Sequence, residues 1–175
     1  ALDEVVVTGF GRVKAYRFDA HGNGEVLAEV ADPGYPSFLG LCFPASDIPR
    51  QARELYRVNR IRVIEDANYQ SSPLLPPLNP VTGNPLDMSF TSLRSVSPVH
   101  LQYMRNMDTL ASMSLSIVVD GQLWGLISCH HAQPRPVALR TRTACELLAS
   151  VLSLQIESRA VSYTHLRAHE TRGNL

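Results

Sequence analysis

The sequence has few cysteines, a single lysine and no net charge. Its 175 residues include three cysteines without C-x-x-C spacing, which is typical of reduced thiols in a cytoplasmic protein and excludes a disulfide framework. Basic and acidic side chains, 16 of each, cancel, so the chain lacks the charge of a nucleic-acid or membrane-surface protein. Lys14 is the one lysine, and the other basic residues are arginines, whose guanidinium groups can bind anions as planar forks.

Long apolar runs and common enzyme motifs are absent as well. No run approaches the roughly 20 apolar residues of a membrane-spanning helix, and the first residues do not resemble a secretory signal. The sequence has no P-loop, no G-x-G-x-x-G and no nucleophile motif. The Cys-His-His run at 129–131 lacks further ligands at zinc spacing. We therefore expect no catalytic residue, no metal site, no nucleic-acid partner and no membrane partner.

What is present indicates one α+β domain, because 45% of the residues are hydrophobic and strand and helix patterns are mixed along the chain. Alternation and turn residues predict strands at residues 13–18, 24–30, 61–64, 113–119 and 123–130. Apolar periodicity predicts helices at residues 47–59, 97–107 and 137–158. Asp120-Gly121 is a strong hairpin signal between the last two strands. We expect a central antiparallel sheet flanked by helices.

Two segments fall outside this pattern. Residues 73–85 hold five of the 12 prolines together with several leucines, which predicts a long ordered loop packed on the body of the domain. Residues 161–175 have no apolar period, shift to His, Thr and Arg, and resemble translated vector sequence. We expect the domain to span residues 1–160 and residues 161–175 to be a disordered, non-native tail.

Three clusters of residues could carry chemistry. In the FPASDIP segment at 43–49, Asp47 is either a helix cap or an acceptor that faces a cleft. On the helix after Ser97-Pro98, His100 and Tyr103 share a face, which is either a locally satisfied surface or an apolar slot for a large conjugated ligand. Alternating serines at 112, 114 and 116 form either a solvated row or the wall of a pocket.

The segments FPASDIP, NRIRVI, LRSVSPVHLQYMRNM and LWGLISCHH, in this order, resemble the GAF domain of bacterial phytochromes over about residues 9–158. The resemblance implies a GAF fold with a lasso-like loop at 67–90. It implies a red/far-red photosensory domain whose cofactor is biliverdin, an open-chain tetrapyrrole with two propionates. The parent protein would be a light-regulated two-component sensor histidine kinase.

The resemblance also assigns roles to residues. Asp47 and His100 match the residues beside the pyrrole nitrogens. His130 matches the histidine that binds the D-ring carbonyl. Arg62 and Arg94 match the arginines that bind the propionates. Tyr16, Phe43 and Tyr103 match the aromatic set around the isomerising D-ring. The other members of the predicted site are apolar, aromatic or hydroxyl-bearing: Ile48, Pro49, Tyr56, Ser97, Met107, Ser112 and Ser114.

Differences between this sequence and that family predict how the bilin is bound and which partner domains are missing. Val99 stands where plant and cyanobacterial phytochromes have the attaching cysteine. Bacterial phytochromes attach the bilin in an upstream PAS domain that this chain lacks, so we expect non-covalent binding. The missing partners would be the PAS, phytochrome-specific and kinase domains, with a possible homodimer through the C-terminal helix. The alternatives are a GAF domain that senses a cyclic nucleotide or one that reduces methionine sulfoxide. A cyclic-nucleotide pocket has no need of the His-Tyr face, and a reductase needs several reactive cysteines.

Overall fold

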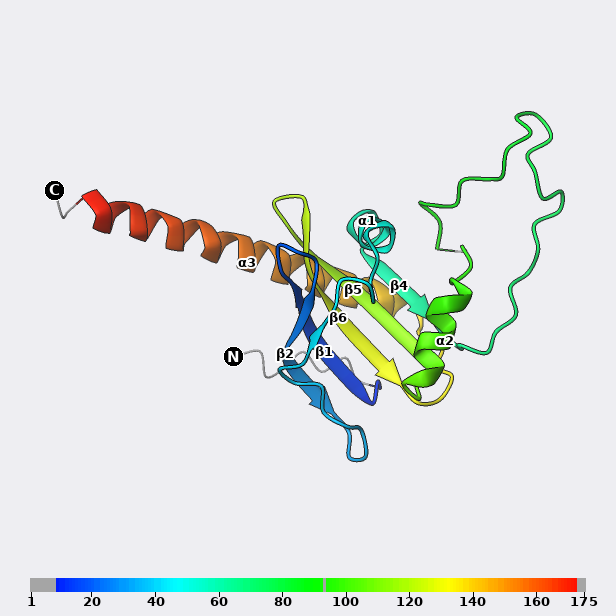
Figure 1. Ribbon diagram of the computed structural model, residues 1–175, viewed down its shortest axis with the longest axis horizontal. Helices are drawn as coiled ribbons and strands as arrows, with labels where there is room; N and C mark the ends of the chain where they lie inside the picture. Colours follow the sequence, from blue (N-terminus) through cyan, green and yellow to red (C-terminus); the bar gives the residue numbers. More distant parts are fainter. Residues whose placement is uncertain (1–8, 93, 173–175) are drawn as a thin grey trace.

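The computed structural model describes residues 9–92 and 94–172, with side chains up to residue 159. Parts of three expectations lie outside the described residues: residues 1–8 of the domain, Leu93 of the LRSVSPVHLQYMRNM segment, and residues 173–175 of the tail. Within the described ranges, one antiparallel sheet and three helices form the chain, so the expected α+β architecture is confirmed. Figure 1 shows the sheet at the centre, with the last helix reaching far from it.

The sheet has the strand order β3-β2-β1-β6-β5-β4, and every neighbouring pair is antiparallel. Its strands are β1 (Arg12–Phe18), β2 (Gly24–Ala31), β3 (Cys42–Phe43), β4 (Ile61–Ile64), β5 (Ala111–Val119) and β6 (Gln122–His131). Asp120 and Gly121 join β5 to β6 with φ values of 49° and 70°, the left-handed geometry of a two-residue hairpin turn. The predicted two-residue hairpin turn is therefore confirmed, and the register shifts once between Ile117 and Val118.

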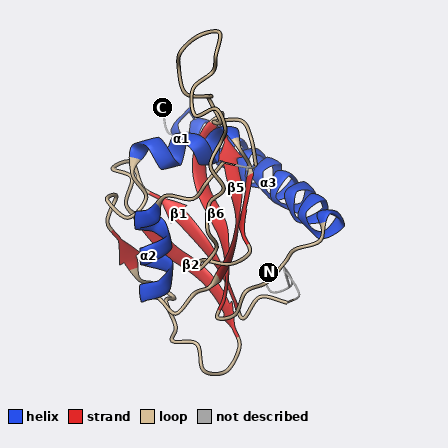
Figure 2. Cartoon of the chain, turned by 90° about the vertical axis from the view of Figure 1, so that its right-hand side faces the viewer, coloured by secondary structure: helices blue, strands red, loops and turns tan. Residues whose placement is uncertain are grey.

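The helices are α1 (Arg50–Val58), α2 (Pro98–Asn106) and α3 (Leu139–Arg172). Figure 2 shows α3 on one side of the sheet and α1 and α2 on the other. The main core lies between the sheet and α3 and consists of Met113, Leu115, Ile117, Ile127, Cys129, Val137, Cys145 and Ala149. In the described part of the chain, no helix combines the length and the apolar character needed to cross a bilayer.

Both α1 and α3 differ from the predicted helices at one end. α1 begins at Arg50 after Pro49, and no side chain caps it, so the interpretation of Asp47 as a helix cap is wrong. The fixed φ of proline suits a helix start and moves the first turn beyond Asp47. α3 continues to Arg172 because no Gly or Pro occurs before Gly173, and its helical backbone at 161–172 differs from the disordered tail we expected. Whether that segment is native remains a prediction.

The proline-rich segment is a loop, but it does not pack on the domain. Between β4 and α2 the described residues form no helix or strand, and the loop extends away from the sheet (Figure 1). Leu75 is 85% exposed and Val81 is 90% exposed. The expectation of a loop packed on the body of the domain is therefore wrong, because most of the surface of these two side chains is exposed.

The contrast between core and loop can be tested with one pair of identical substitutions. Leu115 is 2% exposed between the sheet and α3, whereas Leu75 is 85% exposed. We expect Leu115→Ala to lower the free energy of unfolding by about 2–5 kcal/mol because it leaves a cavity. Leu75→Ala should change that free energy by less than about 0.5 kcal/mol. Urea titration followed by circular dichroism measures both, and equal losses would contradict this assignment of the core.

Candidate functional site

The face of the sheet toward α1 and α2 carries polar side chains. Along β5, Ser112, Ser114 and Ser116 alternate with the apolar residues that pack on α3. The register places Ser112 opposite His130 of β6, and Ser114 opposite Arg62 of β4. All three serines are buried, so they do not form a solvated row.

Aromatic side chains occupy the β1 end of this face. The Tyr16 ring lies 6.1 Å from the Phe43 ring, centroid to centroid. A Cβ at Gly24 would overlap the Tyr16 ring, so only glycine fits beside it. Burial raises the pKa of Tyr16 to about 12, and the proximity of Tyr103 and Asp47 adds to the shift. Tyr103 and Asp47 can both act on Tyr16 because α2, which carries Tyr103, meets the FPASDIP segment, which carries Asp47, at this end of the sheet.

Asp47 is bound to α2 through its carboxylate. The Tyr103 hydroxyl donates a hydrogen bond to this carboxylate. Burial, followed by the charge and the hydrogen bond of Asp47, raises the pKa of Tyr103. The contact joins the segment before α1 to the middle of α2. The Asp47 carboxylate therefore faces the other predicted site residues instead of the end of its own helix.

Two arginines form a cationic pair at the β4 edge. Arg62 Nη2 donates to the main-chain carbonyl of Arg94 at 2.8 Å, and Arg94 Nη1 donates to the carbonyl of Ser89 at 3.2 Å. Burial and then the charge of Arg94 lower the pKa of Arg62. Within the described part of the chain, neither guanidinium forms an ion pair with a carboxylate. Adjacent guanidinium groups without a counter-ion have the charge and the hydrogen-bond donors that attract an anion.

Tyr56 of α1 joins the arginine pair to the serine row. Its side chain is hydrogen-bonded to that of Ser114. Burial raises the pKa of Tyr56, while Ser114 and the charges of Arg62 and Arg94 oppose the rise. The phenol is therefore neutral at physiological pH and adds a hydroxyl group next to the two cations.

Two histidines on the same face of the sheet have lowered pKa values, which favours their neutral forms. The His100 ring stacks on Tyr103 at 6.3 Å, and burial and then Arg62 lower its pKa. The pKa of His130 lies well below its usual value of 6.5, because of burial and then the charges of Lys14 and Arg12. His130 Nε2 lies 3.1 Å from Ser128 Oγ, and its Nδ1 is buried without a partner in the described residues.

The remaining predicted residues divide into two groups. Ile48 packs with Tyr16 and Phe43, so it belongs to the assembled site. Pro49 and Ser97 lie exposed at the starts of α1 and α2, and Met107 is the C-cap of α2. The structure therefore brings most of the predicted set onto one face of the sheet and leaves these three residues at helix ends.

Sequence reasoning missed two cations on this face. Arg12 and Lys14 of β1 alternate with Val13 and Ala15 and are both buried. Val13 and Ala15 pack on the core beside α3, so the cations point toward the side of α1 and α2. The sequence does show these cations alternating with apolar residues along the strand. That pattern is typical of a strand with one face in solvent, so it does not by itself indicate buried cations.

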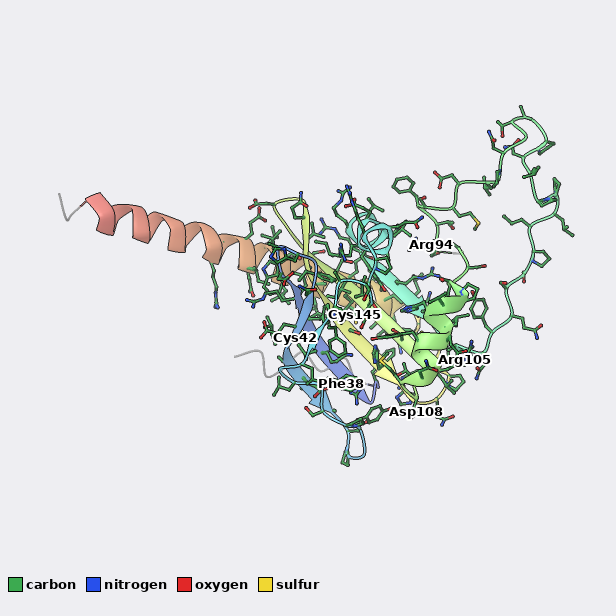
Figure 3. All side chains as sticks on the ribbon, in the orientation of Figure 1. Phe38, Cys42, Arg94, Arg105, Asp108 and Cys145 are labelled. Atoms are coloured by element: carbon green, nitrogen blue, oxygen red, sulfur yellow. The ribbon has the colours of Figure 1, made fainter. Side chains whose placement is uncertain are left out.

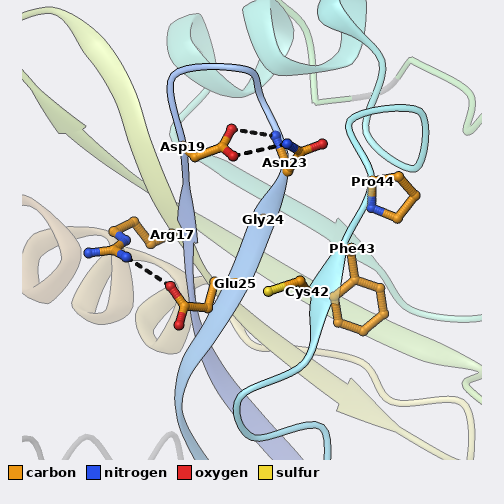
Figure 4. A pocket seen from close by; sticks show the side chains of 8 residues that line it. All are labelled: Arg17, Asp19, Asn23, Gly24, Glu25, Cys42, Phe43 and Pro44. Carbon is orange, nitrogen blue, oxygen red and sulfur yellow. Dashed lines mark hydrogen bonds and ion pairs between the residues drawn. The ribbon is translucent and has the colours of Figure 1, made fainter.

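A surface hollow at the β1–β2 turn adjoins the aromatic end of this site, because Gly24 and Phe43 belong to both. Figure 4 shows its lining: Arg17, Asp19, Asn23, Gly24, Glu25, Cys42, Phe43 and Pro44. Arg17 pairs with Glu25 at 2.8 Å, and Asn23 donates to Asp19, so these polar groups satisfy one another. In the parts of the chain that the structure describes, no group of three His, Cys, Asp or Glu residues could hold a metal ion.

Comparison with known proteins identifies the domain. Residues 5–159 match the model of the GAF domain family. Over 153 residues, 87% of this chain, the sequence is 50% identical to cyanobacterial phytochrome B of Nostoc sp.. It is also 50% identical over 148 residues, 85% of the chain, to the bacteriophytochrome of Xanthomonas campestris pv. campestris. The chain spans 20% and 23% of these two relatives, so it corresponds to about a fifth of their length.

The fold agrees with this relationship. The chromophore-binding domain of an unusual bacteriophytochrome from R. palustris superposes with a TM-score of 0.83 at 53% sequence identity. The match covers 88% of this chain and 51% of that one. The family resemblance found in the sequence is thereby confirmed, and the chain belongs to the GAF domain family as a photosensory GAF domain of the bacteriophytochrome type.

Proposed function

We propose that this domain binds biliverdin as the chromophore of a red/far-red photoreceptor. The observation that carries the proposal is the Arg62–Arg94 pair, two adjacent cations without a carboxylate partner in the described residues. Biliverdin carries two propionates, and arginine holds carboxylates through paired hydrogen bonds. Tyr56 and Ser114 add hydroxyl groups beside the pair. The bound bilin supplies light absorption and isomerisation, and the protein supplies binding and orientation.

The other end of the same face suits the pyrrole rings. A neutral imidazole both accepts and donates hydrogen bonds, and His100 and His130 are neutral near pH 7 because both pKa values are lowered. The buried Nδ1 of His130 has no partner in the described residues, and a ring carbonyl or a shared water would satisfy it. Tyr16 and Phe43 would exclude water from the ring that isomerises.

Non-covalent binding is supported by the positions of the cysteines. Cys129 and Cys145 lie in the core on the α3 side of the sheet (Figure 3 labels Cys145), opposite the proposed site. Burial raises the pKa of Cys129 to about 12, so its thiol stays protonated and unreactive. Cys42 is exposed on β3. Val99, at the position of the attaching cysteine in plant phytochromes, has no thiol.

The parent protein that we propose is a sensor histidine kinase regulated by light. The curated relatives are about five times longer than the matched segment, which leaves room for PAS, phytochrome-specific and kinase domains. We assign no catalytic residue to this domain and propose a cytoplasmic location. A second copy of the chain would bind to α3, where Leu147, Leu148, Val151 and Leu154 are exposed.

Biliverdin addition tests the proposed function directly. We expect purified protein to give an absorption band that is shifted to the red of free biliverdin, because the site holds the pigment extended and protonated. Denaturation in acid should release all of the pigment, as expected for non-covalent binding. A spectrum identical to that of free pigment, together with binding of a fluorescent cyclic nucleotide, would favour the alternative GAF function.

The role of the arginine pair can be separated from general packing by changing the ligand. Arg62→Ala and Arg94→Ala should each weaken biliverdin binding roughly 10- to 100-fold, since a hydrogen bond to a charged group contributes about 1.5–3 kcal/mol. The same variants should bind biliverdin dimethyl ester as wild type does, because the ester has no propionate charge. Arg57→Ala, which removes an exposed arginine of α1, is the matched control. Equal weakening for both ligands would show a structural role instead.

The apolar stripe of α3 predicts the oligomeric state. Leu147 and Leu154 are each 65% exposed and lie two helical turns apart on one face. We expect wild type to sediment as a dimer and Leu147→Glu/Leu154→Glu to sediment as a folded monomer, because burying two charges in a helix interface is costly. Leu75→Glu in the exposed loop should leave the dimer intact. A monomeric wild type would exclude this contact.

A further inference from the structure

Arg53 occupies a position in α1 that the helix itself does not favour. It is the fourth residue of a helix that begins at Arg50, so its cation lies near the positive end of the helix dipole. The first turn of α1 contains no acidic residue that could offset this charge. Arg53 is partly buried and, among the described residues, forms no ion pair with a carboxylate. The position of Arg53 is therefore explained by the other groups that its guanidinium binds.

The guanidinium of Arg53 binds the main chain of the FPASDIP segment. Its Nη1 donates hydrogen bonds to the carbonyl of Ile48 at 2.6 Å and to the carbonyl of Ala45 at 3.3 Å. Ala45 precedes Asp47 by two residues, and Ile48 follows Asp47 directly. Because one nitrogen donates to both carbonyls, the main chain on the two sides of Asp47 is held together by a single side chain.

The β1–β2 turn restricts the guanidinium from another side. A Cβ on Gly22 would lie 2.9 Å from Arg53 Cζ, so the backbone of the turn lies directly against the guanidinium, and its φ of 86° favours glycine. The next residue, Asn23, accepts a hydrogen bond from the Ala45 amide at 3.1 Å and donates one to Asp19 (Figure 4 shows the Asp19 contact). The turn and Arg53 therefore fix the same stretch of main chain.

Asp47 lies between these fixed points. Its amide donates to the carbonyl of Pro44 at 3.0 Å, so the chain already turns immediately before it. Its carboxylate accepts the hydrogen bond of Tyr103 from α2. A side chain keeps one productive direction only when the backbone that carries it is held in place. Arg53 provides this restraint through the carbonyls, although it is not itself bonded to the Asp47 carboxylate in the structure.

We propose that Arg53 is a positioning residue of the bilin site, which holds the FPASDIP segment so that the Asp47 carboxylate meets Tyr103. The effect of Arg53 on bilin binding rests on the proposed function. Its effect on the contact between Asp47 and Tyr103 belongs to the domain itself and can be measured without bilin. The alternative is that Arg53 only stabilises the start of α1, and the two possibilities predict different behaviour of Tyr103.

The ionisation of Tyr103 reports whether Asp47 is in place. Burial, followed by the charge and the hydrogen bond of Asp47, raises the pKa of Tyr103, and the other titratable groups beside the ring are His100 and Tyr16. Removing the positive charge of Arg53 cannot lower the pKa of a phenol, because a nearby cation favours the phenolate. A fall in the pKa of Tyr103 in Arg53→Met therefore has one of two causes, a lost contact with Asp47 or looser packing around the ring.

A pair of backgrounds separates these causes without any ligand. The six tyrosines, labelled with 13Cζ, give six NMR signals, and the spectrum of Tyr103→Phe identifies the one from Tyr103. We expect Arg53→Met to lower the titration midpoint of Tyr103 and to have no further effect when added to Asp47→Ala. Arg50→Met, which removes an exposed arginine of the same helix, should leave the midpoint unchanged. An unchanged midpoint in Arg53→Met, or an equal fall in the Asp47→Ala background, would overturn the inference.

The dissociation constant of biliverdin at pH 7 provides an independent measurement. Arg53→Met and Asp47→Ala should each bind biliverdin roughly tenfold more weakly, and the double variant should bind no more weakly than the weaker single variant. Arg53→Lys should recover part of the affinity, because an ammonium can still donate to one of the carbonyls. Losses that add up in the double variant would show that the two residues act separately. Circular dichroism confirms that all variants are folded.

The outcomes distinguish this inference from the proposed function. If wild type forms no complex with biliverdin but Arg53→Met lowers the midpoint of Tyr103 only when Asp47 is present, the proposed function fails and the positioning of Asp47 stands. If the complex forms and Arg53→Met matches wild type in both the midpoint and the affinity, the role of Arg53 is rejected and the proposed function stands.

Discussion

The domain depends on a sheet whose two faces are both buried but differ in chemistry. Because side chains alternate along a strand, one residue of β5 packs on α3 and the next faces α1 and α2. The α3 side is an apolar core that supplies stability. The other side presents serines, histidines and arginines in a fixed register. The rigidity that positions the polar groups thus comes from hydrophobic packing on the opposite face.

This arrangement leaves positive charge uncompensated on the polar face. Lys14, Arg62 and Arg94 have no carboxylate partner in the described residues, although the whole chain is neutral. Burying such groups costs free energy unless an acceptor is supplied. A ligand that carries carboxylates and carbonyls would stabilise the folded domain by occupying these sites, because anything that binds only the folded state shifts the folding equilibrium. Binding and stability are therefore coupled through the same side chains.

The strands and the polar row were predictable from the sequence because both depend on local rules. Alternation located β5 and β6 to within two residues, and Asp120-Gly121 specified their turn. The short strand β3 was not predictable, since two residues carry no period and pair only through tertiary contact with β2. The start of α1 was also missed, because Pro49 is its N-cap, whereas the Asp47 carboxylate interacts with Tyr103, 56 positions away.

Lys14 shows why part of the polar face could not be predicted from the local pattern of charged and apolar residues. A charged residue that alternates with Val13 and Ala15 is typical of a strand with one face in solvent. Here the segment after β2 covers the second face, and Phe38 from that segment lies over Lys14. The environment of Lys14 is therefore decided by a tertiary contact with Phe38, which lies 24 positions farther along the chain.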